Sequence, residues 1–104
     1  MGTRTDRDDD PLRRAFAAAL RELREGQSMT QEDLAFEAEV GRVSIAQMET
    51  GRRLPSLPTM FRLASGLGVT AAELVGRVEA AGREQGGARS RAPDRPAPRG
   101  GADR

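Results

Sequence analysis

The 104-residue chain contains no cysteine and no histidine. Without cysteine it forms no disulfide, and without both residues it lacks the ligand set of a zinc finger. The missing histidine also removes the side chain that most often transfers protons near neutral pH. Acidic pairs are present, but no glycine-rich phosphate loop or metal-ligand spacing accompanies them. We therefore expect no enzyme activity, no metal and no cofactor.

Long apolar runs are also missing, and the two ends differ in composition from the middle. The sequence offers neither a membrane span nor a signal peptide, so we expect a cytoplasmic protein without membrane contact. Residues 1–10 are mostly charged, and residues 81–104 contain no Leu, Ile, Val or Phe. Such segments bury too little apolar surface to offset the entropy of ordering. We expect disordered segments at 1–10 and 81–104 around one domain at 11–80.

The net charge of +1 hides an uneven distribution. Between residues 11 and 80 nine arginines balance nine acids, whereas residues 81–104 carry six arginines and three acids. A neutral domain can still bind nucleic acid when its charges are sorted by face. The arginine-bearing tail is compatible with nonspecific phosphate contacts and with folding on a partner protein.

The segment 30–51, TQEDLAFEAEVGRVSIAQMETG, spaces its apolar residues as two short helices separated by a turn. Helices this short need neighbours against which to bury their apolar faces. The flanking sequence supplies apolar positions at the same spacing, upstream from Phe16 to Leu23 and downstream from Met60 to Leu67. The pattern therefore predicts a compact all-α domain.

Capping signals divide this domain into five helices. Thr30 with Asp33 and Thr70 with Glu73 have the spacing of capping boxes, and Ser56 is a further N-cap candidate. Gly26, Gly51 and Gly68 are the expected C-terminal stops. The predicted helices run from Pro11 to about Glu25, from the Thr30 cap to about Ala38, from Arg42 to Thr50, from the Ser56 cap to Gly68, and from the Thr70 cap onward.

The segments TQEDLA, RVSIAQMETGRRLPS and LASGLGVTAAEL resemble the Xre/Cro-type helix-turn-helix regulators. The resemblance runs without an internal gap from about Leu12 to Val78. It implies the five-helix lambda-repressor-like fold and a sequence-specific transcriptional regulator that binds double-stranded DNA at the nucleoid. It also implies a homodimer that reads a palindromic operator, for which Leu74, Val75 and Val78 of the fifth helix offer contact residues.

The resemblance assigns roles to individual side chains. The helix beginning at Arg42 would lie in the major groove, where arginine pairs with guanine, glutamine with adenine and valine with a thymine methyl group. A helix N-terminus, such as that at Ser56, favours phosphate. The implied base-reading residues are Arg42, Val43, Ser44 and Gln47, the implied phosphate contacts are Gln31, Arg52, Arg53 and Ser56, and the implied structural bridge is Arg24 with Glu49.

Several positions keep a second interpretation. Arg42 is also compatible with an ordinary solvated residue, and Val43 with packing against Phe36. Glu39 stands where the family usually has glycine, which predicts strain if its φ is positive, and Gly41 is a weak N-cap. The alternative function is a protein-interaction module, such as an antitoxin or adaptor, that contacts its partner through Phe36 or the tail.

Overall fold

The computed structural model describes residues 2–85, with side chains from residue 10 onward. The predicted disordered tail therefore lies largely outside the described residues. Within them the chain forms five helices and no strand, which confirms the predicted all-α class. None of these helices is both long and apolar enough to cross a bilayer. The helices are α1 (Gly2–Gly26), α2 (Gln31–Ala38), α3 (Arg42–Glu49), α4 (Leu57–Leu67) and α5 (Ala71–Gln85).

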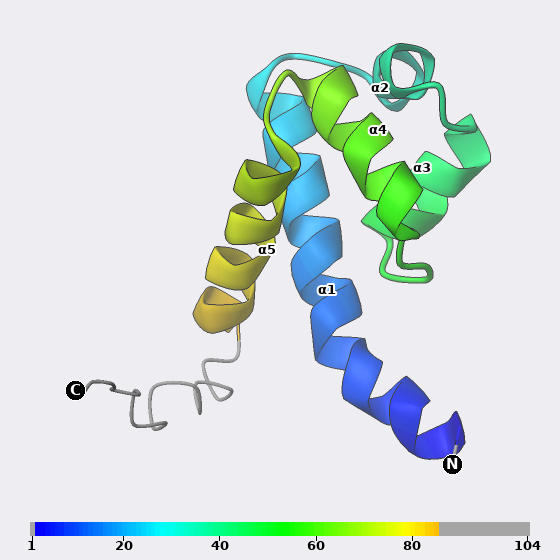
Figure 1. Ribbon diagram of the computed structural model, residues 1–104, viewed down its shortest axis with the longest axis vertical. Helices are drawn as coiled ribbons and strands as arrows, with labels where there is room; N and C mark the ends of the chain where they lie inside the picture. The colour runs from blue at the N-terminus through cyan, green and yellow to red at the C-terminus, as the bar shows by residue number, and fades with distance from the viewer. Residues whose placement is uncertain (1, 86–104) are drawn as a thin grey trace, which may run out of the picture.

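Two groups of helices share one core (Figure 1). α1 and α5 run side by side in opposite directions and make the most extensive contact between helices. α2, α3 and α4 form the other side of the molecule, with α2 packed on α4 and α3 packed on both α1 and α2. α3 is therefore held by elements from both groups.

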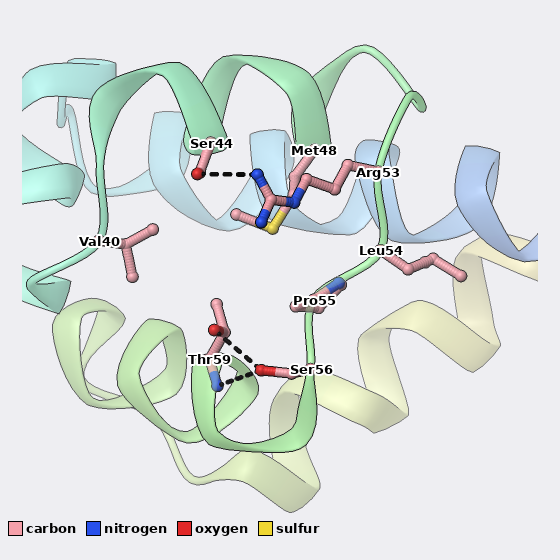
Figure 2. Close-up of a pocket in the computed structure, with 8 residues that line it drawn as sticks. All are labelled: Val40, Ser44, Met48, Arg53, Leu54, Pro55, Ser56 and Thr59. Carbon is pink, nitrogen blue, oxygen red and sulfur yellow. Dashed lines mark hydrogen bonds between the residues drawn. The ribbon is translucent and has the colours of Figure 1, made fainter.

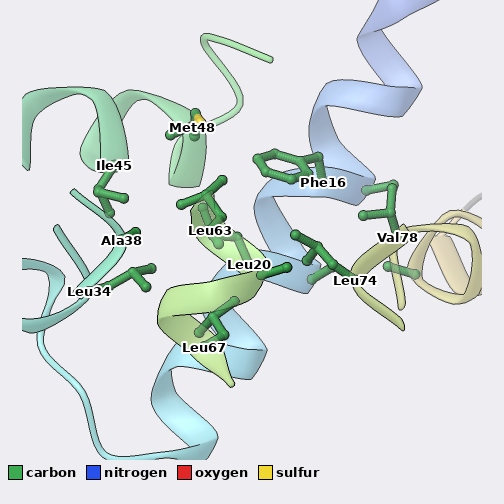
Figure 3. Packing of buried hydrophobic residues seen from close by; sticks show 14 residues of the cluster. Phe16, Leu20, Leu34, Ala38, Ile45, Met48, Leu63, Leu67, Leu74 and Val78 are labelled. Atoms are coloured by element: carbon green, nitrogen blue, oxygen red, sulfur yellow. The ribbon is translucent and has the colours of Figure 1, made fainter. Parts of the chain in front are cut away.

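The core contains large side chains from every helix (Figure 3). Leu20 of α1 and Leu63 of α4 lie near its centre, between residues of the other helices. Fully burying a leucine stabilises the fold by about 1.5–3 kcal/mol, so tertiary packing supplies the stability that the short α2 and α3 lack. The largest fully buried side chains are Phe16, Leu20, Leu34, Ile45, Met48, Leu63, Leu67 and Leu74.

The predicted N-caps are present. Thr30 Oγ1 accepts a hydrogen bond from the Asp33 backbone N–H at 2.9 Å, and Asp33 Oδ2 accepts one from the Thr30 N–H at 2.9 Å. Thr70 and Glu73 form the same reciprocal arrangement at the start of α5. Ser56 caps α4 by accepting from the Thr59 N–H. These bonds pair backbone donors that a helix start otherwise leaves unsatisfied.

Helices extend beyond both ends of the predicted range 11–80. α1 begins at Gly2 rather than at Pro11, so it takes in residues 2–10, which the sequence analysis assigned to a disordered segment. Pro11 has no backbone N–H to donate within the helix, but it is exposed, so water can supply the missing hydrogen bond. An ion pair between Asp10 and Arg13, at 3.8 Å, connects the residues on either side of Pro11. α5 extends beyond residue 80 because Ala81 is buried and prolongs the α1–α5 contact.

The end of α1 also differs in detail. The helix stops at Gly26 as predicted, but the left-handed residue is Ser28, with φ of 59°. The Met29 N–H bonds back to the Arg24 carbonyl at 3.1 Å, so Ser28 turns the chain toward α2. Gly51 and Gly68 do adopt positive φ and end α3 and α4 as expected.

Gly66 marks the closest approach between α2 and α4, and we predict that Gly66→Ala destabilises the protein. An added Cβ would lie 2.9 Å from both Cβ and N of Ala38. Overpacking of this kind costs about 1–3 kcal/mol, which exceeds the gain of roughly 0.5–1 kcal/mol in helix propensity. Urea denaturation measures the change.

Gly76→Ala is the matched control, because Gly76 lies within α5 and has nothing within 4 Å of its added Cβ. Its free energy of unfolding should rise by roughly 0.5–1 kcal/mol. Equal stabilisation by both substitutions would show that α2 and α4 do not pack as closely as described.

Candidate nucleic-acid interface

α3 divides its residues between the core and the solvent. Ile45 and Met48 are buried, while Arg42 and Val43 at its N-terminal end are exposed, Val43 to 70%. Ser44 and Gln47 are half-buried. The four predicted base-reading residues therefore all keep accessible surface on one short helix.

A buried ion pair anchors the C-terminal end of this helix. Arg24 Nε donates to Glu49 Oε2 at 2.6 Å, and Arg24 Nη2 donates to Glu49 Oε1 at 3.0 Å. Arg24 Nη1 also donates to the Met29 carbonyl oxygen at 2.6 Å, which ties the α1–α2 loop to the same guanidinium. The hydrogen bond to Glu49 raises the pKa of Arg24 above its already high ordinary value, so the side chain stays charged.

Gln31, a predicted phosphate contact, joins this pair. Its Nε2 donates to Glu49 Oε1 at 3.1 Å, which links the first residue of α2 to the last residue of α3. One amide N–H is then engaged, and the second remains for another acceptor. The contact between Gln31 and Glu49 could not be predicted from the sequence, because the two residues are 18 positions apart and no local pattern relates them.

The N-terminal end of α3 is held less firmly. Its N-cap is Gly41, which offers no side-chain hydrogen bond. Arg42 Nε lies 3.6 Å from Glu32 Oε2, and both side chains are largely exposed. Exposed pairs of this kind contribute about 0–1 kcal/mol, so Glu32 does little to restrain Arg42.

Arg53, from the loop between α3 and α4, turns back onto α3. Its Nη1 donates to Ser44 Oγ at 3.1 Å and to Gln47 Oε1 at 3.3 Å. Figure 2 shows the guanidinium beside Ser44 at the edge of a hollow of about 330 Å³ that also reaches the start of α4. Arg52 is exposed, and its side chain has no hydrogen bond or ion pair to another described residue. The residues lining the hollow are Val40, Ser44, Met48, Arg53, Leu54, Pro55, Ser56 and Thr59.

The turn between α2 and α3 contains the predicted departure from glycine. Glu39 adopts the left-handed conformation, with φ of 59° and ψ of 45°, and its N–H caps the end of α2. A non-glycine residue in this region carries a conformational cost of order 1 kcal/mol. Substituting glycine there would therefore relieve strain without changing the path of the chain.

The second interpretation of Val43, that it packs against Phe36, is wrong. Phe36 is 80% exposed and Val43 is 70% exposed, so neither side chain covers the other to any large extent. Phe36 instead lines a shallow hollow together with Ala35, Glu37, Glu39, Val40 and Gly41. No group of side chains among the described residues has the composition of a metal site.

Comparison with known proteins identifies relatives of this chain in sequence and in structure. A family model described as "Helix-turn-helix" matches residues 20–74, more than half of the chain. The chain is 38% identical over 69 residues to the HTH-type transcriptional regulator DdrOP3 of Deinococcus deserti, which covers 66% of this chain and 54% of that protein. It thus spans about half the length of this curated relative.

Two solved structures share the arrangement of helices. The restriction-modification controller protein C.AhdI from Aeromonas hydrophila is 35% identical, with a TM-score of 0.58 over 60% of this chain and 94% of that chain. The clp gene regulator ClgR from Corynebacterium glutamicum is 26% identical, with a TM-score of 0.68 over 79% of this chain and 87% of that chain.

Removing Glu49 tests the anchoring of α3. We predict that Glu49→Ala lowers the free energy of unfolding by about 3–5 kcal/mol, because it leaves the buried Arg24 charge with only the exposed Glu25 carboxylate at 3.7 Å. Glu22→Ala is the control, since it breaks the exposed Arg77–Glu22 pair at 2.7 Å, which contributes about 0–1 kcal/mol. If the two variants unfolded at the same urea concentration, the anchoring role of Glu49 would be contradicted.

Proposed function

Because the chain belongs to the Xre/Cro-type helix-turn-helix family of DNA-binding transcriptional regulators, we propose that it is a sequence-specific regulator that reads double-stranded DNA with α3. The observation that carries this proposal is the division of α3 into two faces. Ile45, Met48 and Glu49 are buried, while the opposite side keeps its polar and apolar side chains accessible. A helix of this kind fits the major groove.

Arg42 and Val43 are proposed as base contacts at the N-terminal end of α3. Arg42 is exposed and only loosely paired with Glu32, so its guanidinium is available for guanine O6 and N7. Val43 presents exposed methyl groups that suit the C5-methyl group of thymine. Ser44 lies beside them, and its hydroxyl can donate to an acceptor or accept from a donor on a base edge.

Three further residues are proposed as phosphate contacts. Arg52 is exposed in the loop after α3, where a charge without a partner among the described residues suits the DNA backbone. The second N–H of Gln31 projects from the first residue of α2, and Ser56 marks the N-terminus of α4. Phosphates favour such helix starts because of the free N–H groups and the helix dipole.

We predict that Arg42→Ala removes the preference for guanine at the base pair that Arg42 contacts. A bidentate arginine–guanine contact accounts for about 1–3 kcal/mol of discrimination. The measurement is enrichment of sites from a random double-stranded DNA pool at two salt concentrations, followed by titration of the selected site. Arg77→Ala makes the same charge change on α5 and should leave selection intact.

This function would be contradicted if binding were weak, were suppressed by salt, showed no sequence preference and were unchanged by Arg42→Ala. Such a result would favour the alternative of a protein-interaction module, such as an antitoxin or adaptor, for which the exposed Phe36 is the available contact.

We further propose that two copies bind together, because one eight-residue helix reads few base pairs and half-sites about 34 Å apart suit a two-fold dimer. The fifth helix offers less contact surface than its sequence indicated. Leu74 and Val78 are buried in the monomer, and Val75 is 46% exposed. α4 adds Phe61, which is 59% exposed. The two-fold contact is therefore assigned to the exposed apolar side chains of α4 and α5.

Phe61→Asp should convert the dimer to a monomer, because it places a charge in an apolar contact. Sedimentation equilibrium measures the association, and Phe36→Asp makes the same substitution at an exposed position of α2. A wild-type monomer on a palindromic site, or equal effects of the two substitutions, would rule out this assignment.

A further inference from the structure

Arg53 is exposed, but its guanidinium bonds back onto α3. Its Nη1 donates to Ser44 Oγ and Gln47 Oε1, two acceptors from side chains three residues apart on α3. Residues at this spacing share a helix face. Both belong to the set that the sequence predicts to read bases, so the guanidinium of a loop residue lies beside two of these side chains. Figure 2 shows its contact with Ser44.

The remaining donors of Arg53 have no acceptor within the described residues. A guanidinium carries five N–H groups, and the two on Nη1 match the two acceptors on α3. No carboxylate of residues 10–85 forms an ion pair with Arg53. The edge formed by Nε and Nη2 therefore presents parallel donors, the geometry that binds two acceptors at once.

Resting on the proposed function, we propose that Arg53 reads a guanine through its Nε and Nη2 edge and that Gln47 is the residue that positions it. In the major groove guanine alone presents two acceptors, O6 and N7, on one base edge. A phosphate would also accept from this edge. However, an arginine bonded to two groove-facing side chains of α3 lies over base edges when α3 enters the groove.

This arrangement changes the expected role of Gln47. Bidentate recognition of adenine needs the Gln47 carbonyl oxygen to accept from N6 while the amide N–H donates to N7. That oxygen already accepts from Arg53 Nη1 at 3.3 Å. Because an amide oxygen has two lone pairs, this bond does not exhaust it, but it turns the Gln47 carbonyl toward Arg53. On this proposal the two side chains specify one base pair together instead of two base pairs separately.

Arg52 provides the internal comparison. It is the adjacent residue, carries the same charge and is exposed, but its side chain has no hydrogen bond to Ser44 or Gln47. Arg52 should therefore contribute to affinity for every sequence alike, whereas Arg53 should contribute to the preference at one base pair.

The experiment uses the full chain and its selected DNA site, with every base pair of one half-site substituted in turn. Binding of wild type, Arg53→Lys, Gln47→Ala, the double variant and Arg52→Lys is measured by fluorescence anisotropy over a salt series. Lysine keeps the charge but loses the planar pair of donors. Circular dichroism melting checks that these substitutions at accessible positions leave the fold intact.

Arg53→Lys should reduce the preference for guanine at one position by about tenfold or more. Gln47→Ala should relax the same position, and the double variant should lose little beyond Arg53→Lys alone, as expected for residues that act as a unit. Arg52→Lys should leave all preferences unchanged.

The inference fails, and the proposed function stands, if wild type selects a site and Arg53→Lys retains every base preference. It also fails if Gln47→Ala relaxes an adenine position independently of Arg53. A wild-type protein that enriches no sequence overturns the proposed function and this inference together.

Discussion

The contact between Arg24 and Glu49 is the constraint on which the position of α3 depends. Glu49 is 3% exposed and ends α3, and its carboxylate accepts from both α1 and α2. A buried charge is tolerated only when its partners are complete, so these three helices hold one mutual arrangement. The same guanidinium also binds the Met29 carbonyl oxygen, which brings the loop before α2 into the arrangement.

The two ends of α3 consequently differ in how firmly they are held. Its C-terminal end has the ion pair and the buried Met48, whereas its N-terminal end begins at Gly41 without a side-chain cap. The side chains proposed to contact bases from α3, Arg42, Val43 and Ser44, lie at this freer end. The anchor thus positions the helix, while the reading residues keep the side-chain freedom that binding to DNA requires.

Close packing between α2 and α4 also explains why the chain tolerates a strained turn at Glu39. Glu39 holds a left-handed conformation between α2 and α3, and Gly66 lets α4 come close to Ala38 at the end of α2. The buried Leu34 and Ala38 of α2 stabilise an eight-residue helix that would be marginal alone. The cost of the turn is therefore offset by packing on both sides of it.

The amino-acid sequence alone was sufficient to predict the five helices, three of their N-caps and most of the core, because these depend on residue types at fixed short spacings. It did not reveal that α1 starts before Pro11, since proline inside a helix is tolerated only where the surroundings allow it. Through the resemblance it also indicated Arg24 with Glu49, but not Gln31 as their neighbour.

The positions of Arg53 and Phe36 depend on how the helices pack against one another. Arg53 reaches Ser44 and Gln47 because the loop after α3 folds back. Phe36 is exposed because none of the five described helices covers that side of α2. These outcomes depend on the distances between elements after packing. The spacing of residues along a single chain does not encode those distances.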